Sequence, residues 1–158
     1  PMSTLFDGIQ ELRARYPDEL SAVLPALQLA QEQHGGWLPE EAFREVGTAL
    51  DLTPAYCYSI ASFYDMFRLE PIGRCCVEVC TNVSCAVSGA QAVVEAFAGE
   101  LGIAPGETSE DGDFTVIEAE CLAGCGYPTC VQINSRYFEN VKPADVPGIC
   151  ERLRKDGK

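Results

Sequence analysis

The chain has 158 residues, of which 47% are hydrophobic and 22% charged, and its formal net charge is −13 at pH 7. This composition is that of a folded protein of one or two small domains and not of a disordered chain. The acidic excess repels phosphate groups, which argues against nucleic acid and anionic membrane surfaces as partners.

No stretch approaches the roughly 18 consecutive apolar residues of a membrane helix, and the first residues lack the basic and apolar blocks of a secretion signal. We therefore expect a cytoplasmic protein with no direct membrane insertion. The chain also contains nine cysteines. Because cytoplasmic thiols are kept reduced, these cysteines indicate metal or redox chemistry and not a disulfide framework.

The first half of the chain, residues 3–68, has the apolar spacing of helices. One helix is predicted over residues 19–34, a second from Pro39 to Leu50, and a third from Pro54 into Met66. The proline at the start of a helix costs no hydrogen bond, because the first N–H groups have no partner within the helix. These segments predict a small helical bundle.

After residue 71 the pattern changes, with alternating apolar residues that predict strands. The predicted strands are residues 75–80 and 114–117 and a hairpin of 130–134 with 137–141 around a turn at Ser135 and Arg136. Helices are predicted over residues 88–101 and about 145–155. The predicted fold class is therefore α+β, with a helical bundle at residues 1–70 followed by a βαββα domain at 71–158.

Two cysteine pairs each follow a predicted strand: Cys80-x4-Cys85 and Cys121-x3-Cys125. Loops at strand ends let four thiolates converge without distorting a sheet. Four convergent thiolates bind soft metals or iron–sulfur clusters. Structural zinc sites usually gather cysteines at the tighter x2 spacing, whereas a wider loop suits two irons with one cysteine pair on each. The plant-type ferredoxin pattern has a third cysteine after two more residues, and this chain does not.

Two longer motifs contain these pairs. The first is Val79-Cys80-Thr81-Asn82-Val83-Ser84-Cys85, and the second is Glu120-Cys121-Leu122-Ala123-Gly124-Cys125, continuing to Gln132-Ile133-Asn134 and Tyr137. With Trp37-Leu38-Pro39 and Ala61-Ser62-Phe63-Tyr64 in the helical half, they resemble the thioredoxin-like [2Fe–2S] ferredoxin family, the 24-kDa-type subunit of NADH:quinone oxidoreductase (respiratory complex I). The resemblance covers nearly the whole chain.

The resemblance implies that the second domain is thioredoxin-like and that Cys80, Cys85, Cys121 and Cys125 are the ligands of one [2Fe–2S] cluster. It implies an electron-transfer subunit of an NADH dehydrogenase, with no complete active site of its own. The cluster would exchange single electrons with the FMN of a flavoprotein partner, which also binds NADH. Further subunits of the complex are expected as partners, at the cytoplasmic face of the inner membrane.

One local departure and several alternatives stay open. After the last ligand the family runs two residues and then Ala-Pro, whereas this chain has Gly126-Tyr127-Pro128-Thr129. Equivalent subunits occur in soluble NAD-dependent formate dehydrogenases and hydrogenases. Outside the class, the alternatives are a zinc-stabilised interaction module, a disulfide exchanger, for which the chain lacks a Cys-x-x-Cys pair, and a purely structural subunit.

Other notable residues receive mainly structural interpretations. The remaining cysteines, Cys57, Cys75, Cys76, Cys130 and Cys150, are expected to be small core residues. His34 at a predicted helix end is expected to stabilise that end. The aromatic group of Phe63, Tyr64, Met66 and Phe67 suits either core or a partner surface. From Cys75 to Ser135 the chain has nine acidic residues and no lysine or arginine. Such a stretch suits a solvated face, and negative charge near a cluster also lowers its potential.

Overall fold

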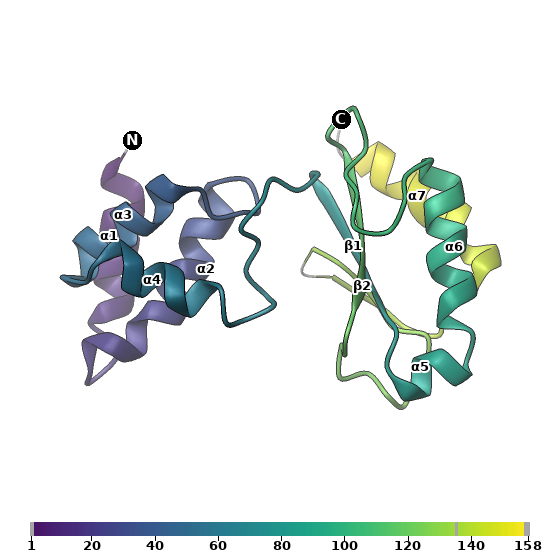
Figure 1. Ribbon diagram of the computed structural model, residues 1–158, viewed down its shortest axis with the longest axis horizontal. Helices are drawn as coiled ribbons and strands as arrows, with labels where there is room; N and C mark the ends of the chain where they lie inside the picture. Colours follow the sequence, from purple (N-terminus) through teal and green to yellow (C-terminus); the bar gives the residue numbers. More distant parts are fainter. Residues whose placement is uncertain (1, 135, 157–158) are drawn as a thin grey trace. The chain divides into compact units, whose positions relative to one another are not determined.

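The structure, a computed structural model, describes residues 2–134 and 136–156. The chain folds into two compact units, one ending at Pro71 and the other beginning at Ile72. Figure 1 shows that the first unit contains only helices and that the second combines strands with helices. The predicted α+β class is confirmed. Within the described residues, no helix is long and apolar enough to cross a membrane.

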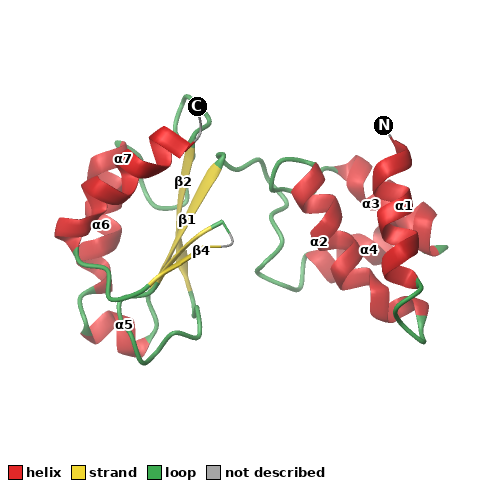
Figure 2. Cartoon of the chain, turned by 180° about the vertical axis from the view of Figure 1, so that it is seen from behind, coloured by secondary structure: helices red, strands yellow, loops and turns green. Residues whose placement is uncertain are grey.

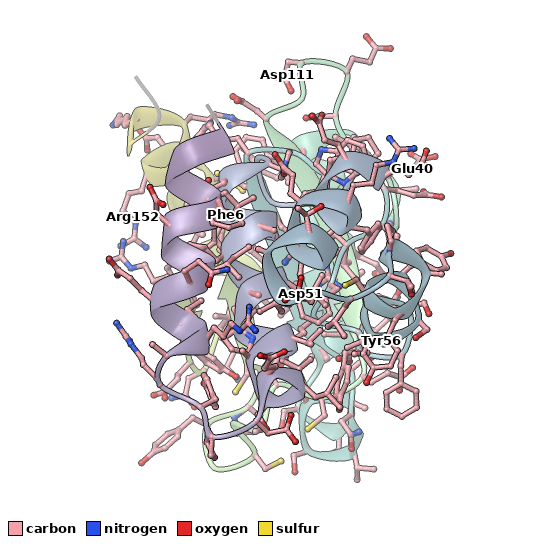
Figure 3. All side chains as sticks on the ribbon, turned by 90° about the vertical axis from the view of Figure 1, so that its left-hand side faces the viewer. Phe6, Glu40, Asp51, Tyr56, Asp111 and Arg152 are labelled. Carbon is pink, nitrogen blue, oxygen red and sulfur yellow. The ribbon has the colours of Figure 1, made fainter. Side chains whose placement is uncertain are left out.

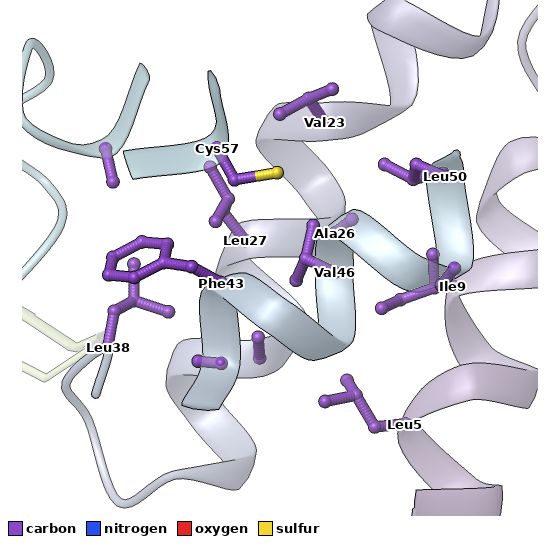
Figure 4. Packing of buried hydrophobic residues seen from close by; sticks show 14 of the residues in the cluster. Leu5, Ile9, Val23, Ala26, Leu27, Leu38, Phe43, Val46, Leu50 and Cys57 are labelled. Atoms are coloured by element: carbon purple, nitrogen blue, oxygen red, sulfur yellow. The ribbon is translucent and has the colours of Figure 1, made fainter. Parts of the chain in front are cut away.

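The helical unit is built around one buried hydrophobic cluster. Its elements are α1 (Met2–Arg13), the 3₁₀ turn η1 (Glu19–Ala22), α2 (Val23–Gln33), α3 (Glu40–Leu50) and α4 (Pro54–Ala61). Leu27 from α2, Val46 from α3 and Cys57 from α4 are all fully buried in the cluster. Figure 4 shows these side chains together with Leu5 and Ile9 of α1. The apolar spacing therefore predicted the bundle correctly, although α1 was not predicted as a separate helix.

Two helix boundaries in this unit differ from the prediction. The helix expected over 19–34 begins with the 3₁₀ turn η1, whose N-cap Asp18 accepts a hydrogen bond from Leu20 N, and α2 ends at Gln33. The helix expected to run into Met66 ends at Ala61. Near that end, the hydroxyls of Ser59 and Ser62 donate to backbone carbonyls three residues earlier. Serine side chains that compete in this way for carbonyls weaken a helix.

The aromatic group after α4 divides between core and surface. Phe67 is 5% exposed and belongs to the core, whereas Phe63 is 80% exposed, and Tyr64 and Met66 also reach solvent. Tyr56 on α4, labelled in Figure 3, is exposed as well. His34 caps the end of α2 through its backbone, and its ring Nε2 lies 2.7 Å from Glu45 Oε2 on α3.

The second unit has a four-stranded sheet with two longer helices on one face (Figures 1 and 2). Its elements are β1 (Cys75–Cys80), α5 (Val83–Val87), α6 (Ala90–Leu101), β2 (Phe114–Ala119), β3 (Val131–Ile133), β4 (Arg136–Phe138), η2 (Pro143–Asp145) and α7 (Val146–Asp156). Val77 and Val79 of β1 and Phe97 of α6 are completely buried in the core between the sheet and α6 and α7. The four predicted strands and the two predicted helices are all present, and the structure adds the short helix α5 between β1 and α6.

The strand order in the sheet is β2-β1-β3-β4. Strands β1 and β2 are parallel, with Val77 opposite Val116 and Cys80 opposite Ala119, and the chain crosses between them through α5 and α6. Strand β3 is antiparallel to both β1 and β4. The carboxyl ends of β1 and β2 and the beginning of β3 therefore share one edge of the sheet.

Two local predictions in this unit are confirmed with changed bounds. The helix expected over 88–101 is α6, which begins at Ala90, and the structure adds the short helix α5 before it; Gly89, with a φ of +94°, separates the two helices. A positive φ is readily adopted by glycine, since it has no Cβ. The hairpin is confirmed as β3 and β4, but both strands are shorter than expected. Of its predicted turn, Arg136 begins β4, and Ser135 lies outside the described residues.

We expect the Phe97→Ala substitution to lower the free energy of unfolding by about 3–5 kcal/mol, because it removes a fully buried ring and leaves a cavity. Urea denaturation of the metal-free protein measures this change. The exposed Gln91 on the same helix provides the control, since Gln91→Ala changes only a solvated position. Equal effects of the two substitutions would contradict the placement of α6 against the sheet.

Candidate metal centre

Three segments of the chain are tied together at the edge of the sheet where β1 and β2 end. Thr81 N donates to Ala119 O at 3.0 Å, which continues the parallel ladder beyond the last strand residue. The Asn82 side-chain amide donates to Glu120 O at 2.8 Å. Cys80 N donates to Cys130 O at 3.0 Å, just before β3 begins. The segments that contain the two cysteine pairs are therefore held side by side by backbone geometry.

The first cysteine pair lies inside the protein. Cys80 is the last residue of β1 and is 3% exposed. Asn82 then caps α5, with its Oδ1 accepting from Val83 N at 2.8 Å. This short helix turns Cys85 inward, where it is 2% exposed, and leaves Val83 and Val87 in solvent. The sequence prediction treated this segment as a loop.

The second pair lies on an exposed loop between β2 and β3. Cys121 and Cys125 are both accessible to solvent. Between them, Ala123 has a φ of +58°, a strained conformation for alanine, and its N–H donates to Cys121 Sγ at 3.3 Å. The Tyr137 hydroxyl of β4 donates to Leu122 O and anchors the loop to the sheet.

The structure places Cys80 beside one member of each pair. The thiols of Cys85 and Cys121 both lie close enough to the sulfur of Cys80 to lower its pKa by hydrogen bonding. Cys125 follows four residues after Cys121 on the same exposed loop. Among the described residues, no three His, Cys, Asp or Glu side chains are arranged around one point that could hold a single metal ion.

The hydrogen bonds around Cys80 favour its thiolate. Burial acts to raise the pKa of Cys80, but the backbone N–H groups of Asn82 and Leu122 donate to its sulfur and oppose that effect. With the additional thiol donors from Cys85 and Cys121, the pKa of Cys80 lies below its ordinary value. Since metals bind the thiolate, this environment prepares Cys80 to act as a ligand.

The neighbouring thiols are held neutral instead. Burial, together with negative charge on Cys80, raises the pKa of Cys85 above its ordinary value. Burial is also the main reason why the pKa of Cys130 is raised to about 11, and charges on Cys85 and Cys80 add to it. One buried thiolate thus disfavours a second beside it, because the two negative charges repel each other. A bound cation would offset this repulsion.

The donor set fits a [2Fe–2S] cluster. Each iron of such a cluster needs only two cysteine thiolates, because bridging sulfides complete its coordination. One buried and one exposed pair, each after a strand that ends at the same edge of the sheet, with N–H donors near Cys80 and Cys121, match that requirement. Next to the site, Thr129 is fully buried, and its hydroxyl has no hydrogen-bond partner in the described part of the chain.

The sequence prediction gave no role to Cys130, which the structure places at the site. Cys130 is completely buried, as expected for a core residue, but it packs with Cys80 and Cys85 in a separate small cluster. The other cysteines expected in the core, Cys57, Cys75, Cys76 and Cys150, are buried as predicted. In the sequence, the feature that could have indicated its place at the site is its position, five residues after Cys125 and directly before a strand.

Comparison with known proteins identifies the family of this arrangement. A family model described as thioredoxin-like [2Fe–2S] ferredoxin matches residues 9–154. The chain belongs to this family. The resemblance inferred from the two cysteine motifs is therefore confirmed, and the matched region includes both units of the structure.

Curated relatives in the family are oxidoreductase subunits. The chain is 38% identical over 149 residues to the E subunit of NADH-quinone oxidoreductase from Rickettsia bellii (strain RML369-C), covering 93% of this chain and 89% of that protein. It is 38% identical over 151 residues to a corresponding E subunit from Rhizobium meliloti (strain 1021), covering 96% and 89%. A mitochondrial NADH dehydrogenase [ubiquinone] flavoprotein 2 of Dictyostelium discoideum is 33% identical over 150 residues, and the match spans 94% of this chain and 61% of that protein.

The fold also matches part of a larger solved structure. The NAD⁺-reducing [NiFe]-hydrogenase in its H₂-reduced state superposes with a TM-score of 0.70 and 25% sequence identity. The match covers 83% of this chain but only 23% of the hydrogenase chain. The combination of elements seen here thus also occurs as one part of a longer polypeptide.

We expect thiolate formation in the metal-free protein to occur in separate steps. Cys80 has a pKa below the 9.0 of an ordinary thiol, whereas Cys130 and Cys150 have pKa values of about 11. The ultraviolet absorbance of thiolates, followed against pH, measures these steps. Cys80→Ala removes the earliest step and Cys150→Ala reduces the latest. A titration whose early step survives in Cys80→Ala would contradict the assignment.

The two raised pKa values also predict a loss of stability at high pH. Cys130 and Cys150 have folded pKa values above that of the unfolded thiol, so the stability that they contribute is complete below about pH 9 and decreases towards pH 11. Urea midpoints of the metal-free protein over this range measure the decrease. It should be smaller in Cys150→Ala, after allowance for that variant's lower overall stability.

Proposed function

We propose that this chain is the electron-transfer subunit of an NADH-quinone oxidoreductase, with one [2Fe–2S] cluster bound by Cys80, Cys85, Cys121 and Cys125. The observation that carries this proposal is that the two cysteine pairs follow strands that end at one sheet edge, where Cys121 lies beside Cys80, in a chain that matches NADH-quinone oxidoreductase subunits over nearly its whole length. When bound, such a cluster accepts and donates single electrons. The FMN and NADH sites would belong to a flavoprotein partner.

The residues of this chain have distinct roles in that function. The β1 end and α5 bury Cys80 and Cys85 and keep water from one side of the site. The exposed loop with Cys121 and Cys125 leaves the other side open to a partner. N–H groups near Cys80 and Cys121 offset the negative charge that the sulfurs concentrate there. The protein thus shields the buried pair from water, while the exposed pair stays accessible to an electron-transfer partner.

The surface around the open side suits protein contact. Val83 and Val87 on α5 are 74% and 83% exposed, and Tyr127 on the ligand loop is 56% exposed. Glu118 and Glu120, in the stretch without lysine or arginine, are exposed at the end of β2, and Glu120 O accepts from the side chain of Asn82, the residue before Val83. We therefore propose that the flavoprotein partner presents basic and apolar side chains to this surface. Further subunits would contact the helical unit, and the complex would place the chain at the cytoplasmic face of the inner membrane.

A second host complex is supported by the solved structures. The likeness to the NAD⁺-reducing [NiFe]-hydrogenase favours an equivalent subunit of a soluble hydrogenase, or of a formate dehydrogenase, as the alternative. Purification from its own cells distinguishes the two hosts, because a membrane-bound quinone reductase and a soluble enzyme separate on centrifugation. We further propose that the two compact units are the two predicted domains.

We expect Ala substitution of any one of the four proposed ligands to abolish or alter the cluster. The wild-type chain should contain iron and acid-labile sulfide in equal amounts, about two of each. EPR of the reduced protein should show a [2Fe–2S] signal, which Cys125→Ala removes or shifts. Cys57→Ala is the matched control, since Cys57 is buried in the helical unit.

The same measurements distinguish the remaining alternatives. A zinc-stabilised module would give a colourless protein with one metal and no sulfide. A purely structural subunit would bind the cluster, but its removal would leave turnover of the assembled complex unchanged. An unaltered EPR signal in Cys125→Ala would overturn the ligand assignment.

We also expect association with the flavoprotein partner to depend on salt. Because the acidic stretch of this chain attracts a basic surface, raising the ionic strength from about 0.05 to 0.5 M should lower the association rate about tenfold. Stopped-flow mixing of the two subunits measures the rate. Glu120→Gln should weaken this dependence, while Glu41→Gln on the helical unit provides the control. A rate independent of salt would contradict the proposed surface.

A further inference from the structure

Cys130 makes contacts that a buried core cysteine does not need. It is completely buried and packs with Cys80, Cys85 and Ala90, apart from the main core of its unit. Its backbone N–H is directed at the sulfur of Cys85, and its thiol lies beside that sulfur. Its carbonyl accepts from Cys80 N at 3.0 Å. The backbone and the side chain of Cys130 thus both contact the buried pair Cys80 and Cys85.

The same thiol also contacts the exposed ligand loop. Cys130 Sγ lies 3.0 Å from Gly124 O and 3.3 Å from Tyr127 O, and it can donate to either carbonyl. These carbonyls are on either side of Cys125 in the sequence. Tyr127 N in turn donates to Gly124 O at 3.0 Å, which closes a tight turn around that cysteine. Cys130 therefore contacts the turn on both sides of Cys125 and joins it to the buried pair Cys80 and Cys85.

Gly124 and Cys130 fit together without room for a further atom. A Cβ placed on Gly124 would lie 2.3 Å from Cys130 Sγ, which is far closer than real contacts allow. The backbone of Gly124 does not have a positive φ. Glycine is therefore required here by the approach of the thiol and not by backbone conformation.

We propose that Cys130 is a positioning residue of the metal centre: its thiol locks the turn that contains Cys125 and joins that turn to the buried pair Cys80 and Cys85. This inference rests on the proposed function, in that the locked turn serves a bound cluster. Residues behind metal ligands commonly determine how firmly the metal is held. Cys130 itself is not a ligand in this proposal.

The first test compares cluster-loaded variants. We expect Cys130→Ala to release iron to a chelator about tenfold faster than the wild type, as is typical when a residue supporting a ligand is lost. The EPR g-values of the reduced protein should shift as well. Cys130→Ser keeps a donor for the two carbonyls and should recover most of the lost lifetime. Cys150→Ala, which removes an equally buried thiol in the main core, is the control.

The second test uses the metal-free protein and the contact between positions 124 and 130. Gly124→Ala should destabilise the chain and speed amide hydrogen exchange in residues 121–130. Adding Cys130→Ala should partly restore the stability, because it removes the sulfur that the new Cβ meets. Additive effects of the two substitutions would overturn the proposed interlock.

The outcomes separate the inference from the proposed function. If the wild type binds no [2Fe–2S] cluster, the proposed function fails and the positioning role fails with it, even where the interlock is observed. If the wild type binds the cluster and Cys130→Ala matches Cys150→Ala in iron release and g-values, only the positioning role is overturned. Faster release and shifted g-values in Cys130→Ala alone, with recovery in Cys130→Ser, support it.

Discussion

The parallel pairing of β1 with β2 is the constraint on which the site depends. Parallel neighbours end at the same edge of a sheet, so residues 80 and 119, which are far apart in the sequence, become adjacent. Such a pair needs a crossover connection, and here α5 and α6 provide it. Because β3 runs antiparallel to β1, its beginning reaches the same edge and brings Cys130 there. Three strand ends thus determine where the cysteines meet.

The sheet fixes the position of Cys80, whereas the loop after β2 keeps Cys121 and Cys125 accessible to solvent. Val77, Val79 and Val116 are fully buried, so a shift in strand register would move apolar side chains out of the core. The register therefore fixes Cys80 firmly. The loop with Cys121 and Cys125 has no strand pairing and is held by single hydrogen bonds, at Leu122 O, at Tyr127 O and within the turn around Cys125. It leaves both of its thiols accessible to solvent.

The sequence predicted features that depend on local patterns and on well-separated motifs. Apolar spacing was sufficient for the bundle and for β1, and the placement of two cysteine pairs after strands was sufficient for a common site. Prediction failed where neighbours in space decide the outcome. α4 ends where serine hydroxyls hydrogen-bond to backbone carbonyls, and the unpredicted helix α5 is capped by Asn82 and turns Cys85 into the protein interior. The importance of Cys130 depends on contacts across the sheet edge, which spacing along the chain does not reveal.

The uneven exposure of the nine cysteines has a consequence for oxidative damage. Only Cys121 and Cys125 reach solvent, and the other seven are buried. In the metal-free protein, peroxide and disulfide reagents therefore meet first the two thiols that we propose as ligands. Oxidation of either one would remove a ligand before a cluster could be inserted, whereas a bound cluster would engage both sulfurs. Loading the site would thus protect the most vulnerable thiols of the chain.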